Sequence, residues 1–252
     1  MDTEELFYPE ISAVLGGYML NKGVEVEVYS DQDSYFDWAK VRFTPQFQAN
    51  ISVGDKEPGQ ILLGYNGVLD TVFEGYVAPG GYNGGGYKDE IVLKDKMLLL
   101  EETTISNTFL DATPQEVISY CLAQAGVTEA KLSDTIYQPR AVVPIAQKNV
   151  ISVIKEIGTI WGIKHRFFFS GGVFYWGEKP EQEKTYSFEY GVNIISLDKP
   201  LGLWELETVS APFVKHSHKI SVTHPKVSGE FEVKKVVFRT NETGFIRTYI
   251  SF

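Results

Sequence analysis

The chain has 252 residues, which is enough for one large domain or for two to three smaller modules with a buried core. Its formal net charge of −10 argues against a general binder of nucleic acid or of anionic membranes, since both need a basic surface. A single cysteine, Cys121, excludes an intramolecular disulfide framework and is typical of folding in a reducing cytoplasm.

The N-terminal stretch MDTEELFYPE is acidic and lacks the basic and apolar regions of a signal peptide. No apolar run approaches the ~20 residues of a membrane-spanning helix. We therefore expect a soluble protein without a membrane partner. The many aromatic residues, 14 Tyr, 16 Phe and 4 Trp, favour an ordered fold rich in β-structure.

The first part of the chain, residues 1–104, is predicted to consist mainly of strands. Residues 18–29 alternate, with three valines on one face and Glu25 and Glu27 on the other. This pattern predicts one half-buried strand whose acidic face meets solvent or a partner. Further strands are predicted at 38–43, 61–64, 70–77 and 87–95.

The stretch 53–77 is rich in turn residues. Asn66-Gly67 stands between two apolar runs, which is a strong signal for a β-hairpin because both residues tolerate a positive φ. Gly75 lies inside the next run, where a glycine is typical of a bulge or a barrel corner. We interpret the stretch as part of a small curved barrel, followed by a surface loop at Pro79–Gly86.

Residues 105–180 are predicted to form an α/β module of two helices and a hairpin. Thr113 is expected to cap the first helix, with proline at the first helical position and Glu116 closing a capping box. A second helix begins at Asn149. Ser170-Gly171-Gly172 then separates two strands rich in aromatic residues.

Residues 181–252 return to a β pattern. Strands are predicted at 204–209, 215–224, 231–238 and 244–252, with turns at 227–229 and 241–244. The predicted fold class is therefore α+β, mainly β, with one β region before the α/β insert and one after it.

Three histidines are the candidates for a metal site. His216 and His218 are two positions apart on a predicted strand, so both are expected on one face, and His224 follows six positions later. A catalytic metal site needs further ligands and neighbouring residues that hold the ligands in position by hydrogen bonds. Glu207 and Glu230 have no diagnostic spacing to the histidines. Surface or interface histidines are therefore favoured over a metal site.

Other motifs give no catalytic or cofactor site. The glycine run lacks the lysine and hydroxyl residue of a phosphate-binding loop, and no nucleophile elbow is present. Cys121 is expected to pack as a small hydrophobic residue. Pairs of acids on one strand do not make the opposed acids of a glycosidase. These pairs are Glu25/Glu27, Asp31/Asp33, Asp89/Glu90 and Glu101/Glu102.

The order of five segments resembles a known family. They are VGDKEPGQILLGYNG with VFEGYV, then DEIVLKDKMLLLEETTISNTF, TPQEVISYCLAQAGV, NVISVIKEIGTIWGIKHRFFFSGGVFYWG and HKISVTHPKVSGEFEVKKVVFRTNETGFIRTYIS. This succession, from about Val24 to Ile250, is similar to that of the late-control-D-like hub proteins in the baseplates of phage tails and contractile injection particles. The similarity lies in order and spacing rather than in any one motif.

The resemblance implies a structural protein without an enzyme activity or a cofactor. Each subunit would hold two small barrels like those of a tail tube, and a homotrimer would match the sixfold tail tube to the threefold central spike. Tail tube, spike and other baseplate proteins are the implied partners, with DNA as transient cargo. The implied location is a virion tail or tail-like particle, assembled in the bacterial cytoplasm. Glu25 and Glu27 could then line the lumen, where negative charge would keep DNA from binding.

Two alternatives remain open at this point. One is a module that binds carbohydrate or peptidoglycan through Trp161, Tyr175 and Trp176, which would require these rings to be exposed on one face. The other is a metal-dependent hydrolase centred on the three histidines.

Overall fold

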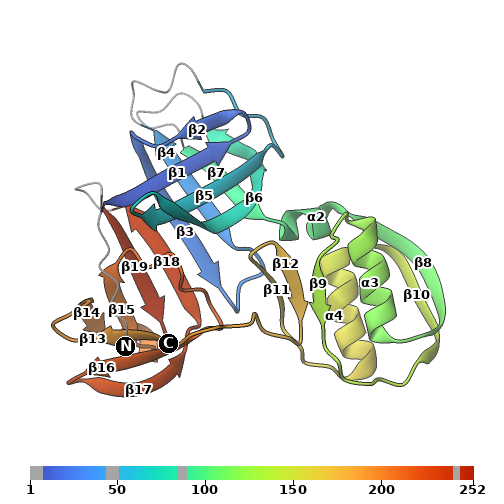
Figure 1. The fold of residues 1–252 in the computed structure, drawn as a ribbon. Helices are drawn as coiled ribbons and strands as arrows, with labels where there is room; N and C mark the ends of the chain where they lie inside the picture. Colours follow the sequence, from blue (N-terminus) through green and yellow to red (C-terminus); the bar gives the residue numbers. More distant parts are fainter. Residues whose placement is uncertain (1–7, 44–50, 84–89, 241–244) are drawn as a thin grey trace. The chain divides into compact units, whose positions relative to one another are not determined.

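The computed structural model describes residues 8–43, 51–83, 90–240 and 245–252. The chain divides into two compact units. The first contains residues 1–95 and 180–252, and the second contains residues 96–179 between them. The second unit is therefore inserted into the sequence of the first (Figure 1).

One sheet of eleven strands organises the first unit. Its strand order is β14-β15-β19-β18-β3-β4-β7-β6-β5-β1-β2. The strands from the first part of the chain are β1 (Pro9–Leu15), β2 (Tyr18–Leu20), β3 (Val24–Asp31), β4 (Trp38–Phe43), β5 (Pro58–Tyr65), β6 (Val68–Asn83) and β7 (Glu90–Asp95). Those from the last part are β14 (Ile194–Asp198), β15 (Glu205–Val209), β18 (Lys235–Thr240) and β19 (Ile246–Ser251).

The two β regions meet where β18 pairs antiparallel with β3, from Lys235 opposite Asp31 to Arg239 opposite Glu27. Figure 1 shows these strands side by side, one at each end of the colour range. Within the described residues no strand pairing closes either region, and β2 and β14 end the sheet. The mainly β fold is confirmed, and the arrangement as two barrels stays a prediction.

The predicted hairpin at Asn66-Gly67 is confirmed. The two residues have φ of 54° and 80° and connect β5 to β6, whose pairing runs up to Tyr65 opposite Val68. Further along β6, Gly75 pairs with Gly59 of β5 and with Asp95 of β7. An added Cβ at Gly75 would lie 2.1 Å from the carbonyl oxygen of Lys94, so only glycine allows this close approach of β6 to β7.

Several predicted strands are interrupted by turns. The single strand expected over 18–29 is two, β2 and β3, because the chain turns through Gly23 with φ of 71°. The strand expected at 231–238 is divided between β17 (Val227–Glu232) and β18, so the turn expected at 227–229 is wrong. The turn expected at 241–244 lies outside the described residues.

A second, three-stranded sheet with the order β13-β16-β17 completes the first unit. Its strands are β13 (Tyr186–Glu189), β16 (Lys219–His224) and β17, and a one-turn 3₁₀ helix, η1 (Pro200–Gly202), precedes β15. Both β regions contribute to one hydrophobic core, which includes Val28, Leu63, Val222 and Ile250. The pairing of β18 with β3 is therefore accompanied by shared burial of apolar side chains, the main favourable contribution to folding.

The second unit consists of three helices and five strands. The helices are α2 (Met97–Glu102), α3 (Pro114–Gln124) and α4 (Val150–Trp161). The strands are β8 (Thr104–Ala112), β9 (Ala130–Leu132), β10 (Arg140–Asn149), β11 (Phe167–Ser170) and β12 (Val173–Trp176). β8 pairs with β10, and β12 lies between β11 and β9.

Both predicted helix starts are confirmed. Thr113 and Glu116 form the capping box, in which each side chain accepts a hydrogen bond from the other residue's backbone N–H. The Asn149 side chain accepts from Ser152 N at 2.9 Å, and Gly162, in the left-handed conformation, ends α4. The hairpin of β11 and β12 is confirmed as well. Helix α2 and the long pair β8–β10 lie where the sequence patterns indicated neither.

Candidate functional site

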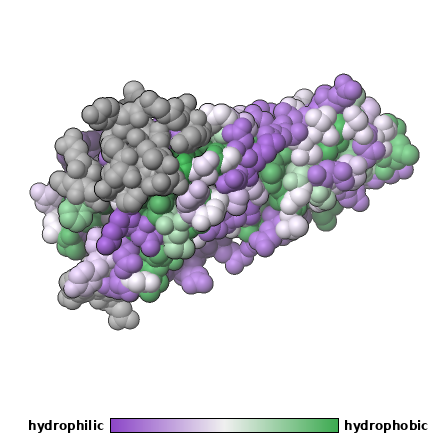
Figure 2. Space-filling model, turned by 90° about the horizontal axis from the view of Figure 1, so that it is seen from above, coloured by the Kyte–Doolittle hydropathy of each residue, from purple (hydrophilic) through white to green (hydrophobic). Residues whose placement is uncertain are grey.

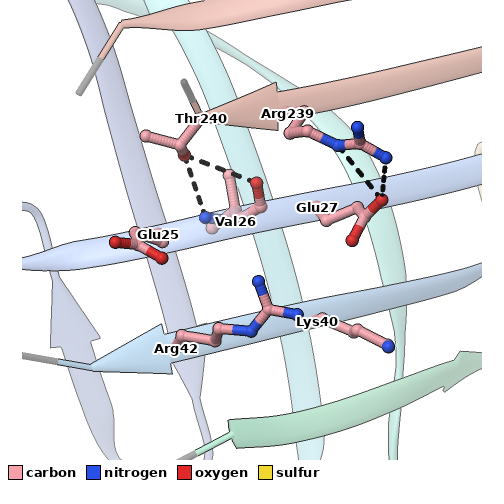
Figure 3. A pocket seen from close by; sticks show the side chains of 7 residues that line it. All are labelled: Glu25, Val26, Glu27, Lys40, Arg42, Arg239 and Thr240. Carbon is pink, nitrogen blue, oxygen red and sulfur yellow. Dashed lines mark hydrogen bonds and ion pairs between the residues drawn. The ribbon is translucent and has the colours of Figure 1, made fainter. Parts of the chain in front are cut away.

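Glu25 and Glu27 lie on the face of β3 that points away from the core. The alternating pattern predicted this, since Val26 and Val28 between and beyond them are 3% and 0% exposed. Figure 3 shows the two glutamates between the side chains of β4 and those of β18. These neighbours decide the electrostatic character of the face.

On one side, β18 places a base and a hydroxyl against β3. Arg239 forms an ion pair with Glu27, and its Nε lies 3.2 Å from Glu27 Oε1. Val26 N donates a hydrogen bond to Thr240 Oγ1 over 2.9 Å (Figure 3). These contacts join β3 to β18, strands from the first and last parts of the chain.

On the other side, β4 adds two bases. Lys40 is opposite Glu27 in the strand register and Arg42 is opposite Glu25. Both bases also contact Glu90 on β7, with Arg42 Nε 2.7 Å from Glu90 Oε2 and Lys40 Nζ 3.7 Å from Glu90 Oε1. Positive and negative side chains therefore alternate across these strands.

The pattern continues onto β19 and β15. Arg247 Nε lies 3.9 Å from Glu207 Oε1, and the Tyr249 hydroxyl lies 3.5 Å from the same oxygen. The Arg239 guanidinium lies 5.8 Å from the Tyr249 ring centroid, within the range of a cation–π contact. Burial, followed by the negative charge of Glu207, raises the pKa of the Tyr249 hydroxyl.

We call this set of eight side chains the charged face: Glu25, Glu27, Lys40, Arg42, Glu90, Glu207, Arg239 and Arg247. Its acids and bases are equal in number. The sequence expectation of an acidic face considered β3 alone, and the neighbouring strands supply the compensating bases. Paired charges of this kind produce a weak long-range electrostatic field, because each charge interacts mainly with its partner. They therefore attract a charged ligand only weakly.

An aromatic pair lies on the same side of the sheet, further along β3 and β4. The rings of Tyr29 and Trp38 are stacked with centroids 5.2 Å apart. Lys40 Nζ lies 5.2 Å from the Trp38 ring centroid, and Lys235 Nζ lies 5.9 Å from that of Tyr29. Burial and a hydrogen bond to Asp31 raise the pKa of the Tyr29 hydroxyl to about 12, so this hydroxyl stays neutral.

A largely buried acid, Asp37, lies just before β4. Its carboxylate accepts hydrogen bonds from Ser30 Oγ and from Asp31 N, the second at 3.1 Å. His216 Nε2 lies 4.0 Å from Asp37 Oδ2. Burial, with a smaller contribution from the charge of Asp31, raises the pKa of Asp37 to about 7 against the effect of its two hydrogen bonds. No sequence pattern indicated this residue: Ser30 and Asp31 are six to seven positions away, and His216 comes from the last part of the chain.

His216 and His218 do not lie on a strand, and the surface or interface position favoured from the sequence is wrong for both, because they are buried. The strand expected at 215–224 begins only at Lys219, because Ser217 has φ of 66° and turns the chain. His216 is buried and its Nδ1 is 3.1 Å from Ser217 Oγ. His218 Nδ1 accepts from Lys215 N at 3.3 Å, and burial lowers the pKa of this ring to about 4.

His224 is engaged separately. Its Nδ1 accepts from Lys226 N at 3.0 Å, and its ring meets that of Tyr190 edge-on with centroids 4.8 Å apart. Among the residues that the structure describes, no group of three or more His, Cys, Asp or Glu side chains could hold a metal ion. The three histidines therefore do not form the metal site that the metal-dependent hydrolase would require.

The aromatic residues proposed for glycan stacking are not exposed together. Tyr175 is 6% and Trp176 is 1% exposed. Trp161 donates its indole N–H to Gln138 O at 2.9 Å. Because stacking on a sugar needs an open ring face, Tyr175 and Trp176 cannot supply one in this fold.

Cys121 is buried on the apolar face of α3, as expected, and burial raises the pKa of its thiol to about 12. The loop expected at Pro79–Gly86 is wrong in its first part, because β6 continues to Asn83 and pairs there with β7. The rest of the glycine run and Asp89 lie outside the described residues. No helix of the described chain has the length and hydropathy needed to span a membrane. Hydrophobic residues in the view of Figure 2 are scattered among hydrophilic ones.

Comparison with protein-family models finds no match to this chain. Comparison with curated proteins likewise finds no significant match. Neither sequence comparison therefore assigns a family.

Solved structures, in contrast, share its fold. A 43 kDa tail protein of prophage MuSo2 from Shewanella oneidensis is similar with a TM-score of 0.75 at 11% identity, over 97% of both chains. A tail protein from Neisseria meningitidis has a TM-score of 0.69 at 11% identity, over 97% of this chain and 96% of its own.

An Escherichia coli component of the type VI secretion system, itself similar to bacteriophage T4 tail proteins, gives a TM-score of 0.65 at 10% identity. The similarity covers 95% of this chain and 75% of that one. At this level of identity the similarity concerns the fold, which this chain shares with phage tail proteins and a secretion-system relative.

Proposed function

We propose that this chain is a structural hub subunit in the baseplate of a phage tail or a related injection particle. The observation that carries the proposal is the match in fold with two tail proteins over nearly the whole of each chain. The inserted second unit and the β regions before and after it are all included in this match.

The proposed assembly is a homotrimer that adapts the sixfold tail tube to the threefold central spike, as the resemblance to late-control-D-like hubs implies. The single eleven-stranded sheet supports this proposal, because β18 and β3 hold two β regions side by side in each subunit. Three subunits would then present six such regions, each the equivalent of one tail-tube barrel. Closed rotational symmetry is the usual form of homo-oligomers.

The charged face is the proposed lining of the lumen, with Glu25 and Glu27 among its members. From the sequence, repulsion by negative charge is the expected reason that DNA would not bind this lining. Because acids and bases are balanced on the charged face, the reason becomes the lack of excess positive charge. A polyanion such as DNA meets no excess of positive charge there, and the paired bases are already engaged. DNA would pass as transient cargo without being held.

The role proposed is non-enzymatic. Tail tube, central spike and other baseplate proteins are the proposed partners, and a virion tail or tail-like particle assembled in the bacterial cytoplasm is the proposed location. Any cleavage of the cell wall would then be supplied by a partner protein.

Co-expression with tail tube and spike proteins from the same genome tests the proposal. We expect the chain to co-purify with both, and light scattering of the complex to give three copies per particle. Omitting the spike protein from the co-expression is the control for indirect association. A chain that stays monomeric at high concentration and binds neither protein would refute the proposed function.

A further inference from the structure

The eleven-stranded sheet ends at β14, which pairs with β15 and has one further bridge, between Ile194 and Tyr190, so its available edge begins after Ile194. Ile195 within this strand is 49% exposed, and Val192 just before it is 73% exposed. A terminal strand with exposed apolar neighbours presents backbone groups to which a further strand could pair, and proteins commonly protect such edges with charged side chains.

One lysine reaches this edge from the neighbouring sheet. Lys226 lies in the turn between β16 and β17, and its Nζ donates a hydrogen bond to Leu197 O over 2.7 Å. The same Nζ lies 3.4 Å from Asp198 Oδ1. The N–H and C=O of one strand residue point to the same side, so the backbone groups of Leu197 face away from β15. Lys226 therefore occupies a position that the N–H of an added strand would use.

We propose that β14 is an edge that pairs with a second copy of this chain, and that Lys226 covers it until the copies assemble. This inference rests on the proposed oligomeric hub and names one of its contact surfaces. The second copy is the favoured partner because the opposite end of the same sheet, β2, also has one described neighbour and exposes Met19 to 69%. Each molecule thus carries two different sheet ends, as a head-to-tail ring requires.

The cover is removable. The Lys226 side chain is 54% exposed and that of Asp198 is 77% exposed, so solvent screens their ion pair. A lysine at an edge opposes pairing by its charge and by occupying an acceptor, but it can swing away at little cost in free energy. A buried cover would instead close the edge permanently.

The test compares Lys226→Ala with the parent chain by light scattering over a range of concentrations. We expect the substitution to strengthen self-association about tenfold or more, since an edge acceptor is released and a charge is removed. Lys226→Arg, which keeps the charge and the donor, should behave as the parent. Lys219→Ala, which removes an exposed lysine from β16, is the matched control for a lower positive charge.

A second substitution locates the association. Ile195→Lys in the Lys226→Ala background places a charge on an exposed residue of β14 and should return the protein to the parent's state. Hydrogen exchange should slow at 195–198 when Lys226→Ala associates. Unchanged association of Lys226→Ala, association that Ile195→Lys does not remove, or pairing of the edge only with another protein would each overturn the inference. Circular dichroism checks that each variant is folded.

The outcomes separate this inference from the proposed function. If the parent chain assembles with tube and spike proteins but Lys226→Ala does not self-associate more strongly, the edge proposal fails and the hub proposal stands. If Lys226→Ala self-associates through β14 but the chain binds neither tail protein, the hub proposal fails and the edge proposal stands.

Discussion

The guanidinium of Arg239 on β18 donates to the carboxylate of Glu27 on β3, although the two residues are 212 positions apart in the sequence. The pair lies on the antiparallel pairing that joins the first and last parts of the chain in one sheet. This pairing is stabilised by backbone hydrogen bonds, by the buried core on one face of the sheet and by charged side chains on the other. We expect the core to contribute much more to stability than the charged side chains do.

Replacing Arg239 with Gln should lower the free energy of unfolding by less than about 1 kcal/mol, because the Arg239 side chain is 53% exposed and exposed ion pairs are weak. Urea unfolding of Arg239→Gln, Glu27→Gln and the double variant measures the coupling between the two side chains. A coupling well above this value would show that the pair itself holds the two β regions together.

Replacing Ile250 with Ala should lower the free energy of unfolding by about 2–5 kcal/mol, since a fully buried side chain leaves a cavity. Ile250 is 0% exposed and lies on β19, between β15 and β18. Ile195→Ala, at an exposed position, is the matched control and should change stability by less than about 0.5 kcal/mol. Equal effects of the two substitutions would contradict the burial seen at β19.

Replacing Gly75 with Ala should destabilise the first unit by about 1–3 kcal/mol, as expected for overpacking. The new Cβ would lie 2.1 Å from Lys94 O and 2.8 Å from Lys94 C, and backbone atoms in a paired strand cannot move aside as a flexible side chain can. Gly17→Ala is the control, because no heavy atom lies within 4 Å of its added Cβ. Thermal unfolding of both variants provides the comparison, and a neutral Gly75→Ala would argue against the close approach of β6 to β7.

Asp37 should make the protein less stable as pH rises from about 4 to about 7. Its pKa is raised from 3.8 to about 7 in the fold, chiefly by burial, so the folded protein holds this proton more tightly than the unfolded chain does. The stabilisation is complete below the unfolded pKa and is lost as pH rises through the folded one. The difference in unfolding free energy between the parent and Asp37→Asn, measured from pH 4 to 8, isolates this effect. A difference that does not change with pH would refute it.

His218 should act in the opposite direction. Burial, followed by the charge of Lys215, lowers the pKa of its ring from 6.5 to about 4, so the folded protein holds the neutral form. Its stabilising contribution is present above pH 6.5 and is lost as pH falls through about 4. His218→Gln, compared with the parent over pH 4–7.5, should lose this dependence. Faster loss of stability in the variant on acidification would contradict the prediction.

Local signals in the sequence predicted the local structure well. A helix cap or a tight turn forms from a few adjacent residues, so a short stretch of sequence is enough to predict it. This holds for the caps at Thr113 and Asn149 and for the turn at Asn66-Gly67. Alternation along β3 likewise placed Glu25 and Glu27 on the outer face, because the period of a strand is independent of its partners.

Features that depend on distant partners could not be predicted. The bases of the charged face come from β4, β18 and β19, and only the strand register brings Lys40 and Arg239 next to Glu27. The same holds for Asp37 and His216. The strand expected through His216 and His218 failed for a different reason: a polar run with alternating pattern gives no warning of the positive φ at Ser217.

The insertion of residues 96–179 has a consequence for synthesis on the ribosome. The β3 strand emerges early, but its partner β18 is made roughly 200 residues later, which takes about 10–40 s at ordinary elongation rates. The second unit is made completely during this interval and contains its own core, so it can fold first. Until β18 arrives, one side of β3 is an unpaired strand edge in the nascent chain, and a chaperone that shields this edge would raise the yield of folded protein.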